Sequence, residues 1–215
     1  MSTVERAVAS GGHSGPGVYG MVARVLEERG IRGGRLLDVG CGQGALAAHV
    51  LAHVDAYEGA DVVRHPGFPA AYPLHLRDMD AGRLPLADGS FDVVACVETI
   101  EHVENPRALV RELVRLVRPG GLVLVTTPNQ LSLLSLLCLW RFGQFDAFRD
   151  GSYPAHITAL VPQDLMRIGR EVGLEDLRLT YSDSGRVPFS GRRYPRGFRG
   201  ARFSDNVAVS GLRSA

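Results

Sequence analysis

The stretch LLDVGCGQG at residues 36–44 limits most strongly what this chain can fold into. An apolar run ends in Asp38, three alternating glycines follow, and an apolar segment compatible with a helix covers residues 45–54. This order predicts a buried strand, a tight turn and a helix N-terminus. Glycine has no Cβ and accepts positive φ, so a ligand can approach bare backbone at such a turn. The free N–H groups of a helix start add to such a binding site.

Two kinds of cofactor fit this turn. Gly40, Gly42 and Ala45 match the dinucleotide pattern G-x-G-x-x-G/A. Asp38 stands at the carboxyl end of the strand, where it can accept hydrogen bonds from a cationic amine. A carboxylate beside bare backbone suits the ammonium and carboxylate groups in the methionine part of S-adenosylmethionine. The stretch alone leaves both cofactors open.

Composition sets limits on the class of protein and its location. The 215 residues suit a single domain, and a net charge of +1 gives no global attraction to nucleic acid or anionic membranes. The three cysteines have no metal-type spacing and suit a reducing cytoplasm. We find no signal segment, and the apolar residues 131–140 are too few to span a bilayer. We therefore expect a cytoplasmic protein without a transmembrane segment.

Strand and helix signals alternate along most of the chain. Residues 1–17 are rich in Gly, Ser and Ala and predict a mobile tail, whereas Asn105-Pro106 is typical of a helix N-terminus. The alternation predicts a parallel, doubly wound α/β sheet, in which ligands lie beyond the carboxyl ends of the strands. The predicted strand ends carry Asp38, Asp61, Asp80, Glu98 and Pro128, which should converge on one crevice.

The end of the chain departs from this alternation. A helix is predicted over residues 162–172, followed by strands at 174–181 and 203–212 with no helix between them. This order indicates a hairpin that carries an antiparallel edge strand. A dinucleotide domain would more often continue the alternation of strand and helix, so the pattern favours S-adenosylmethionine.

Three motifs in this order resemble the class I S-adenosylmethionine-dependent methyltransferases: residues 36–44, DAGRLPLADGSFDVVACVETIEHV at 80–103, and RPGGLVLVTTPN at 118–129. The resemblance runs from about residue 30 to 212. It implies a methyltransferase enzyme with a Rossmann-like sheet of seven strands, mostly parallel, with an antiparallel last strand and helices on both faces. It also implies that residues 1–215 form one methyltransferase domain.

The resemblance assigns cofactor roles to particular residues. Asp61 is similar to the acid that binds the ribose, and Asp80 to the acid that accepts the adenine amino group. Val97 and Glu98 border the place where the methyl group faces the substrate. The full expected cofactor set is Asp38, Gly40, Cys41, Gly42, Gly44, Asp61, Met79, Asp80, Ala81 and Val97, with Met79 and Ala81 beside the base.

The sequence ETIEH at residues 98–102 carries the expected chemistry of the acceptor side. If this segment is helical, Glu98, Glu101 and His102 share one face and can bind a divalent cation. The pattern resembles the ubiquinone-pathway O-methyltransferases and the small-RNA 2′-O-methyltransferases, both of which have a later histidine, here His156. We expect Glu98, His102 and His156 to be catalytic, and Glu98, Glu101, His102 and His156 to bind Mg²⁺ or another divalent metal. The alternative is that Glu101 and His102 are packing residues of a metal-free enzyme.

Two segments bear on the acceptor. The apolar residues 131–148, within an expected acceptor-side insertion at 129–160, suit a pocket for an apolar or aromatic acceptor, contact with a membrane surface, or a helix packed on the body. Residues 183–202, between the last two strands, hold six arginines opposed only by Asp183 within the segment. They suit an anionic acceptor or RNA, or form an ordinary solvated loop.

These observations predict transfer of a methyl group from S-adenosylmethionine to a small-molecule acceptor at a hydroxyl. One alternative is metal-dependent methylation of an RNA ribose 2′-hydroxyl, which the near-neutral charge opposes. The other alternative is a non-catalytic module that only binds S-adenosylmethionine.

Overall fold

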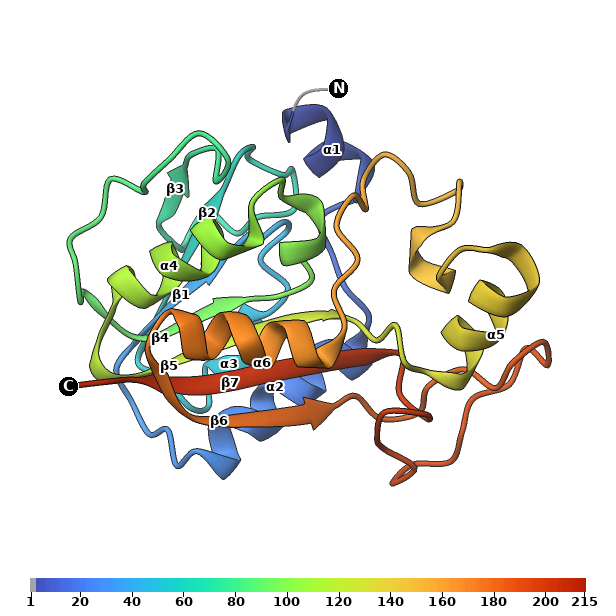
Figure 1. Ribbon diagram of the computed structural model, residues 1–215. Helices are drawn as coiled ribbons and strands as arrows, with labels where there is room; N and C mark the ends of the chain where they lie inside the picture. Colours follow the sequence, from blue (N-terminus) through green and yellow to red (C-terminus); the bar gives the residue numbers. More distant parts are fainter. Residues whose placement is uncertain (1–2) are drawn as a thin grey trace.

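The computed structural model describes residues 3–215 and contains one sheet of seven strands in the order β3-β2-β1-β4-β5-β7-β6 (Figure 1). Neighbouring strands from β3 to β5 pair in parallel, and β7 runs antiparallel to both β5 and β6. This arrangement confirms the predicted fold class. The strands are β1 (Arg35–Val39), β2 (Ala56–Asp61), β3 (Leu74–Leu76), β4 (Phe91–Cys96), β5 (Val117–Pro128), β6 (Leu174–Tyr181) and β7 (Asn206–Arg213).

The hairpin connection had suggested that the antiparallel strand lies at the edge of the sheet. The structure places it inside the sheet instead. β7 is inserted between β5 and β6, so that β6 becomes the edge. Residues 207–211 of β7 are all buried, whereas β6 exposes residues along its length. The more apolar strand therefore takes the inner position, where both of its faces are covered.

Helices cover both faces of the sheet (Figure 1). α2 (Pro16–Glu28) and α3 (Ala47–Val50) pack on the face that carries Leu36, Val93 and Leu122. α4 (Pro106–Leu116) and α6 (Pro162–Glu171) pack on the opposite face, which carries the alternate strand residues. Because side chains alternate along a strand, adjacent residues of one strand belong to different cores.

The helix expected after the glycine turn is shorter than residues 45–54. α3 covers only Ala47–Val50, and the chain then turns back toward β1. The backbone explains this early end, because Gly33 N–H donates to the His53 carbonyl and Asp55 N–H donates to the Gly34 carbonyl. The residues that would extend the helix are used instead to start β2 beside β1.

The N-terminal segment, expected to be a mobile tail, is part of the wall of the ligand cavity. Residues 1 and 2 of that tail lie outside the described residues, but helix α1 (Thr3–Ala9) follows them. The buried Arg6 forms ion pairs with Asp80 at 3.1 Å and with Glu104 at 3.4 Å. The Gly12 carbonyl accepts a hydrogen bond from Gln43 N–H at 2.7 Å. These contacts hold the segment across the carboxyl ends of the strands.

Helix α5 (Leu133–Phe142) lies beyond the sheet, to the right in Figure 1. Ser132 caps its N-terminus by accepting a hydrogen bond from Ser135 N–H, and Gly143 ends it with a φ of 72°. The short 3-10 helices η1 (Ile100–His102) and η2 (Asp146–Phe148) also lie beyond strand ends. Among residues 3–215, no helix is both long enough and apolar enough to cross a membrane.

Candidate functional site

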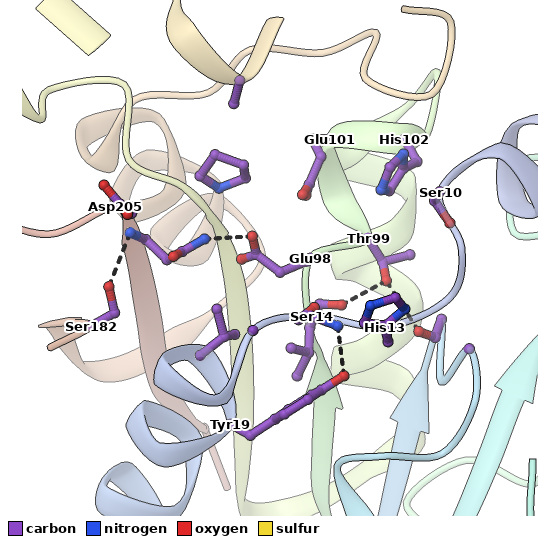
Figure 2. Close-up of a pocket in the computed structure, with 18 of the residues that line it drawn as sticks. Ser10, His13, Ser14, Tyr19, Glu98, Thr99, Glu101, His102, Ser182 and Asp205 are labelled. Atoms are coloured by element: carbon purple, nitrogen blue, oxygen red, sulfur yellow. Dashed lines mark hydrogen bonds between the residues drawn. The ribbon is translucent and has the colours of Figure 1, made fainter. Parts of the chain in front are cut away.

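A cavity of about 1070 Å³ lies beyond the carboxyl ends of β1, β2, β4 and β5. We call its part near Asp38 and Asp61 the donor lobe, and its part formed by residues 128–135, 146–156 and 182–206 the acceptor lobe. Figure 2 shows Glu98 near the middle of the cavity, with Ser182 and Asp205 to its left and Tyr19 below it. Of the predicted site residues, the cavity is lined by Asp38, Gly40, Cys41, Gly42, Asp61, Met79, Val97, Glu98, Glu101, His102 and His156, but not by Gly44, Asp80 or Ala81.

Asp38 offers one free carboxylate oxygen to the donor lobe. Its Oδ2 accepts a hydrogen bond of 2.7 Å from the Tyr57 hydroxyl, whereas its buried Oδ1 has no hydrogen-bond partner among the described residues. Burial raises the pKa of Asp38 to about 7. An unpartnered buried oxygen is costly, and a cationic amine would satisfy it. The arrangement fits the ammonium group expected from S-adenosylmethionine.

The glycine turn has no room for side chains at two positions. A Cβ at Gly40 would collide with the Thr99 side chain, and a Cβ at Gly42 would collide with the Gly12 backbone. Both residues also have positive φ values, 76° and 51°. Gly42 N–H donates to Asp61 Oδ2 at 2.8 Å, so the acid at the end of β2 holds the turn in place. The turn is thus a closed backbone cradle beside the cavity.

Asp80 faces helix α1 rather than the cavity. Its Oδ2 pairs with Arg6, and its Oδ1 accepts a hydrogen bond from Glu104 N–H at 3.0 Å. Met79 lines the donor lobe, while Ala81 is exposed. The expected adenine acid is therefore already engaged by an arginine from the N-terminal segment, which sequence reasoning had left out of the site.

Glu98 has a special backbone conformation and does not share a face with Glu101. Its φ is 48°, which is uncommon for a residue with a Cβ, and η1 begins only at Ile100. The Thr126 hydroxyl donates to Glu98 Oε1 at 2.8 Å, and Asn206 Nδ2 donates to Oε2 at 2.6 Å. Burial raises the pKa of Glu98 to about 7. The structure therefore removes Glu98 from the predicted metal group, because its side chain turns to β5 and β7.

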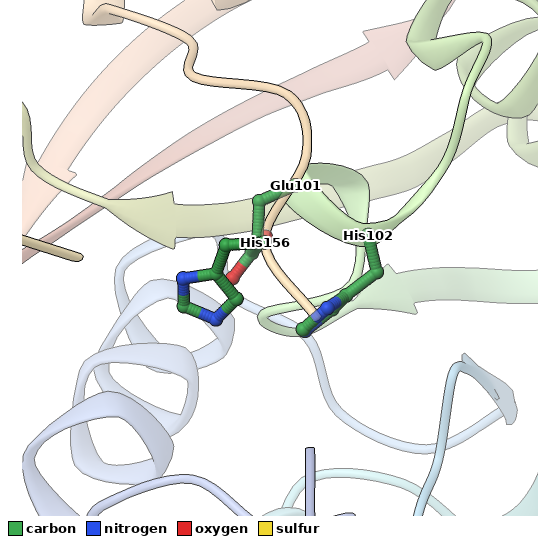
Figure 3. A group of neighbouring side chains, drawn as sticks. All are labelled: Glu101, His102 and His156. Carbon is green, nitrogen blue, oxygen red and sulfur yellow. The ribbon is translucent and has the colours of Figure 1, made fainter. Parts of the chain in front are cut away.

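The other three members of that group do come together (Figure 3). Glu101 and His102 are adjacent in η1, and His156 reaches them from the loop after η2. One possible ligand atom from each residue lies within 4.8 Å of the others. Thr127 donates to Glu101 Oε2 at 3.2 Å, while the buried Glu101 Oε1 has no hydrogen-bond partner within residues 3–215.

Backbone carbonyls fix the orientation of both histidines. His102 Nδ1 lies 2.8 Å from the Ala155 carbonyl oxygen, and His156 Nδ1 lies 2.6 Å from that of Ala147. Burial lowers the pKa of His102 to about 4 and also lowers that of His156, which favours the neutral form of both rings. Since each Nδ1 then donates its hydrogen, each Nε2 keeps a lone pair. One carboxylate oxygen and two such nitrogens form a donor set that fits a divalent cation.

Sequence reasoning missed the residues that position these groups. Thr126, Thr127 and Asn206 hold the two glutamates, and Arg6 holds Asp80. The two threonines carry a signal that could have found them, because adjacent polar residues at the carboxyl end of a buried strand face the ligand crevice. Arg6 gives no such signal, because only the folded chain brings it to a residue 74 positions away.

The apolar insertion does not line the acceptor lobe with apolar side chains, contrary to one expectation. Its residues on the cavity include Ser132, Ser135 and Asp146. Trp140 is 83% exposed, and Phe142 is 46% exposed. The reason is the orientation of α5, whose buried side includes Ser135 and Cys138 and whose apolar residues continue around to solvent.

Three of the six arginines in the arginine-rich segment, Arg186, Arg193 and Arg199, pair with acids. Arg186 pairs with Asp146 at 2.8 Å and with Asp205 at 3.0 Å, and Arg193 pairs with Asp205 at 3.5 Å. Asp146 and Asp205 lie outside residues 183–202, so the count of charges within the segment did not include these acidic partners. These pairs join the segment to η2 and to the start of β7, and they form a polar wall of the acceptor lobe.

Comparison with known proteins places these features in a family. A family described as "methyltransferase domain" matches residues 20–179. The chain is similar to ubiquinone biosynthesis O-methyltransferases from Thiobacillus denitrificans, at 31% identity over 70% of this chain and 68% of that protein, and from Aeromonas salmonicida, at 28% over 67% and 64%. It therefore spans less than two thirds of the Aeromonas protein.

A solved structure supports the fold. A methyltransferase from Thermotoga maritima, described as a possible histamine N-methyltransferase, aligns with a TM-score of 0.65 and 19% sequence identity. The alignment covers 91% of this chain and 89% of that one. At this identity, the likeness concerns the fold.

Proposed function

Because this chain belongs to the methyltransferase-domain family and is an S-adenosylmethionine-dependent methyltransferase, we propose that it methylates a hydroxyl oxygen of a small-molecule acceptor. The name of the relatives, O-methyltransferase, agrees with this choice of atom. The observation that carries the proposal is the convergence of Glu101, His102 and His156 beside the donor lobe. An oxygen nucleophile must lose its proton, and a base or a metal that lowers its pKa supports that loss.

The donor lobe would hold S-adenosylmethionine through residues at the ends of β1 and β2. Asp38 Oδ1 would bind its ammonium group, Asp61 would bind the ribose, and Met79 would lie beside the base. When bound, this donor supplies a methyl group on a sulfonium, which is already a good leaving group. The chain's task is then to bring the acceptor oxygen into line with the methyl–sulfur bond.

Methyl transfer forms one bond and breaks one bond. An electron pair of the acceptor oxygen forms the new bond to the methyl carbon, and the carbon–sulfur electron pair returns to sulfur, which becomes a neutral thioether. Glu98 would accept the hydroxyl proton, because it lines the cavity and is held there by Thr126 and Asn206. Glu101, His102 and His156 would hold a divalent cation such as Mg²⁺, which lowers the pKa of a hydroxyl bound to it.

Two observations favour a small molecule over RNA. Three of the six arginines that suggested an RNA contact, Arg186, Arg193 and Arg199, are paired with acids. The protein also has a net charge of only +1, whereas binding to a phosphate backbone requires a surplus of positive charge.

The outward apolar side chains of α5 support peripheral contact with a membrane surface. Leu139, Trp140 and Phe142 are exposed, and Arg141 and Arg149 stack on the Phe142 ring. Exposed aromatic residues next to arginines suit the interface of an anionic bilayer.

Product analysis tests the reaction. The protein is incubated with S-adenosylmethionine labelled in the methyl group, Mg²⁺ and a panel of hydroxylated and aminated small molecules. We expect the label in an O-methyl ether and none of it in an N-methyl product. Label only on nitrogen would refute the proposed reaction. Equal turnover with and without a chelator would refute the role of the cation.

A further inference from the structure

The acceptor lobe is lined almost entirely by polar residues. Three segments, 128–135, 146–156 and 182–206, contribute its walls, and their apolar residues on the cavity are Pro128 and Ala147. An alkyl or prenyl chain placed there would remove water from hydroxyl, carboxylate and guanidinium groups without replacing their hydrogen bonds, which costs free energy. An acceptor with many hydroxyl groups can replace those hydrogen bonds.

The acceptor lobe is lined by three acids and three arginines, and one of these arginines has no acidic partner among the described residues. The third acid, Asp183, pairs with Arg24 and Arg199, which do not line the cavity. Asp146 and Asp205 are balanced by Arg186 and Arg193 through three ion pairs. Arg196 also lines the cavity, and within residues 3–215 it forms no ion pair. A guanidinium group presents a planar fork of donors that matches a phosphate or carboxylate. The lobe therefore offers one cation to an anionic group on the acceptor.

We propose that the acceptor is a small, hydroxyl-rich anion, a sugar bearing a phosphate or a carboxylate, whose anionic group binds Arg196. The inference rests on the proposed function, because it takes the acceptor lobe to be the place where a hydroxyl is methylated. It gives Arg196 a role in specificity, and it excludes the apolar acceptor that the insertion had suggested.

The chain provides a matched control for the test. Arg192 lies in the same loop and is exposed, but it does not line the cavity, and it forms no ion pair in the described part of the chain. Arg192→Ala and Arg196→Ala therefore remove the same charge from the same loop, and only the second removes it from the lobe.

Calorimetry with protein saturated with S-adenosylhomocysteine measures binding of glucose 6-phosphate, glucuronate, glucose and a catechol with a short isoprenoid chain. We expect one of the two anions to bind at least about tenfold more tightly than glucose, and Arg196→Ala alone to abolish that preference. The two anions distinguish a phosphate from a carboxylate. Equal binding of glucose and both anions, or an equal loss in Arg192→Ala, would overturn the inference.

Methyl transfer is measured in parallel, so that a failure of the anionic acceptor can be distinguished from a failure of the proposed function. If the catechol is methylated while neither anion binds, the proposed function stands and the anionic acceptor is wrong. If an anion binds through Arg196 and no acceptor receives a methyl group on oxygen, the binding inference stands and the proposed function fails.

Discussion

Thr126 and Thr127 are neighbours on β5, and each hydroxyl holds a different glutamate of the same cavity. Thr126 donates to Glu98 at 2.8 Å, and Thr127 donates to Glu101 at 3.2 Å. The ligand atoms of Glu101 lie close to those of His102 and His156, and Glu98 is not part of that group. The pair thus separates a candidate proton acceptor from a candidate metal ligand.

Substitution of the two threonines should separate these roles. Thr126→Val leaves Glu98 without two hydrogen bonds, one from the threonine hydroxyl to the carboxylate and one from its own N–H to that hydroxyl. We expect a loss of about 1–3 kcal/mol in the free energy of unfolding and a lower kcat, with unchanged Mn²⁺ affinity. Thr127→Val should instead weaken Mn²⁺ binding, and Thr126→Ser should restore kcat. The same effect of both valine variants on Mn²⁺ affinity would contradict the separation.

Removal of a proposed ligand should weaken cation binding. We expect Glu101→Gln to weaken Mn²⁺ binding by more than about tenfold, because even residues behind the ligands change metal affinity about 10- to 100-fold. Glu104→Gln is the matched control, since it removes a carboxylate three residues away that lies outside the cavity and should leave Mn²⁺ binding within about twofold. Electron paramagnetic resonance of free Mn²⁺ measures both affinities. Wild-type affinity in Glu101→Gln would rule out the site.

Asp38→Asn should lower the affinity for S-adenosylmethionine. The amide keeps an oxygen for the Tyr57 hydroxyl, so the fold is retained, but the charge facing the ammonium group is lost. Hydrogen bonds to charged groups contribute about 1.5–3 kcal/mol, which corresponds to about 10- to 100-fold in Kd. Calorimetric titration measures the loss, with Asp150→Asn, an exposed acid outside the cavity, as the control.

The affinity for S-adenosylmethionine should also rise with pH. Burial raises the pKa of Asp38 to about 7, so below that pH the carboxyl is neutral and attracts the ammonium group less. Between pH 8 and pH 6 we expect Kd to increase about tenfold, with a proton released on binding at the lower pH. Titrations at pH 6 in buffers of different ionisation enthalpy detect that proton. The Asp38→Asn variant should show neither effect.

Trp140 should report contact with a membrane surface. It is the only tryptophan and is 83% exposed on the outward side of α5. We expect its fluorescence to shift to shorter wavelength with vesicles of phosphatidylglycerol and to stay unchanged with phosphatidylcholine, because nearby arginines favour an anionic surface. Phe142→Ser should weaken the shift. No shift with anionic vesicles would show that α5 does not insert.

Much of the fold and the donor lobe could be predicted from the sequence, because their signals are local. Residues 36–44 alone indicated a strand, a turn and a ligand cradle, and the structure has β1 and a tight turn at these positions. The absence of a predicted helix between the last two strands indicated an antiparallel strand, and β7 is antiparallel to both of its neighbours. Such features depend on backbone preferences and periodicity, which neighbouring residues determine.

Only the tertiary structure decided how the acceptor side is arranged. The sequence predicted Glu98, Glu101 and His102 on one helical face. In the structure Glu98 lies before the short helix η1, has a positive φ, and accepts a hydrogen bond from Thr126. Arg186 forms ion pairs with acids outside its segment, and Arg6 forms an ion pair with Asp80. These outcomes depend on contacts between distant parts of the chain. A pattern in the sequence therefore determined where the glycine turn and its neighbouring acids lie, and packing determined which charges face the rest of the cavity.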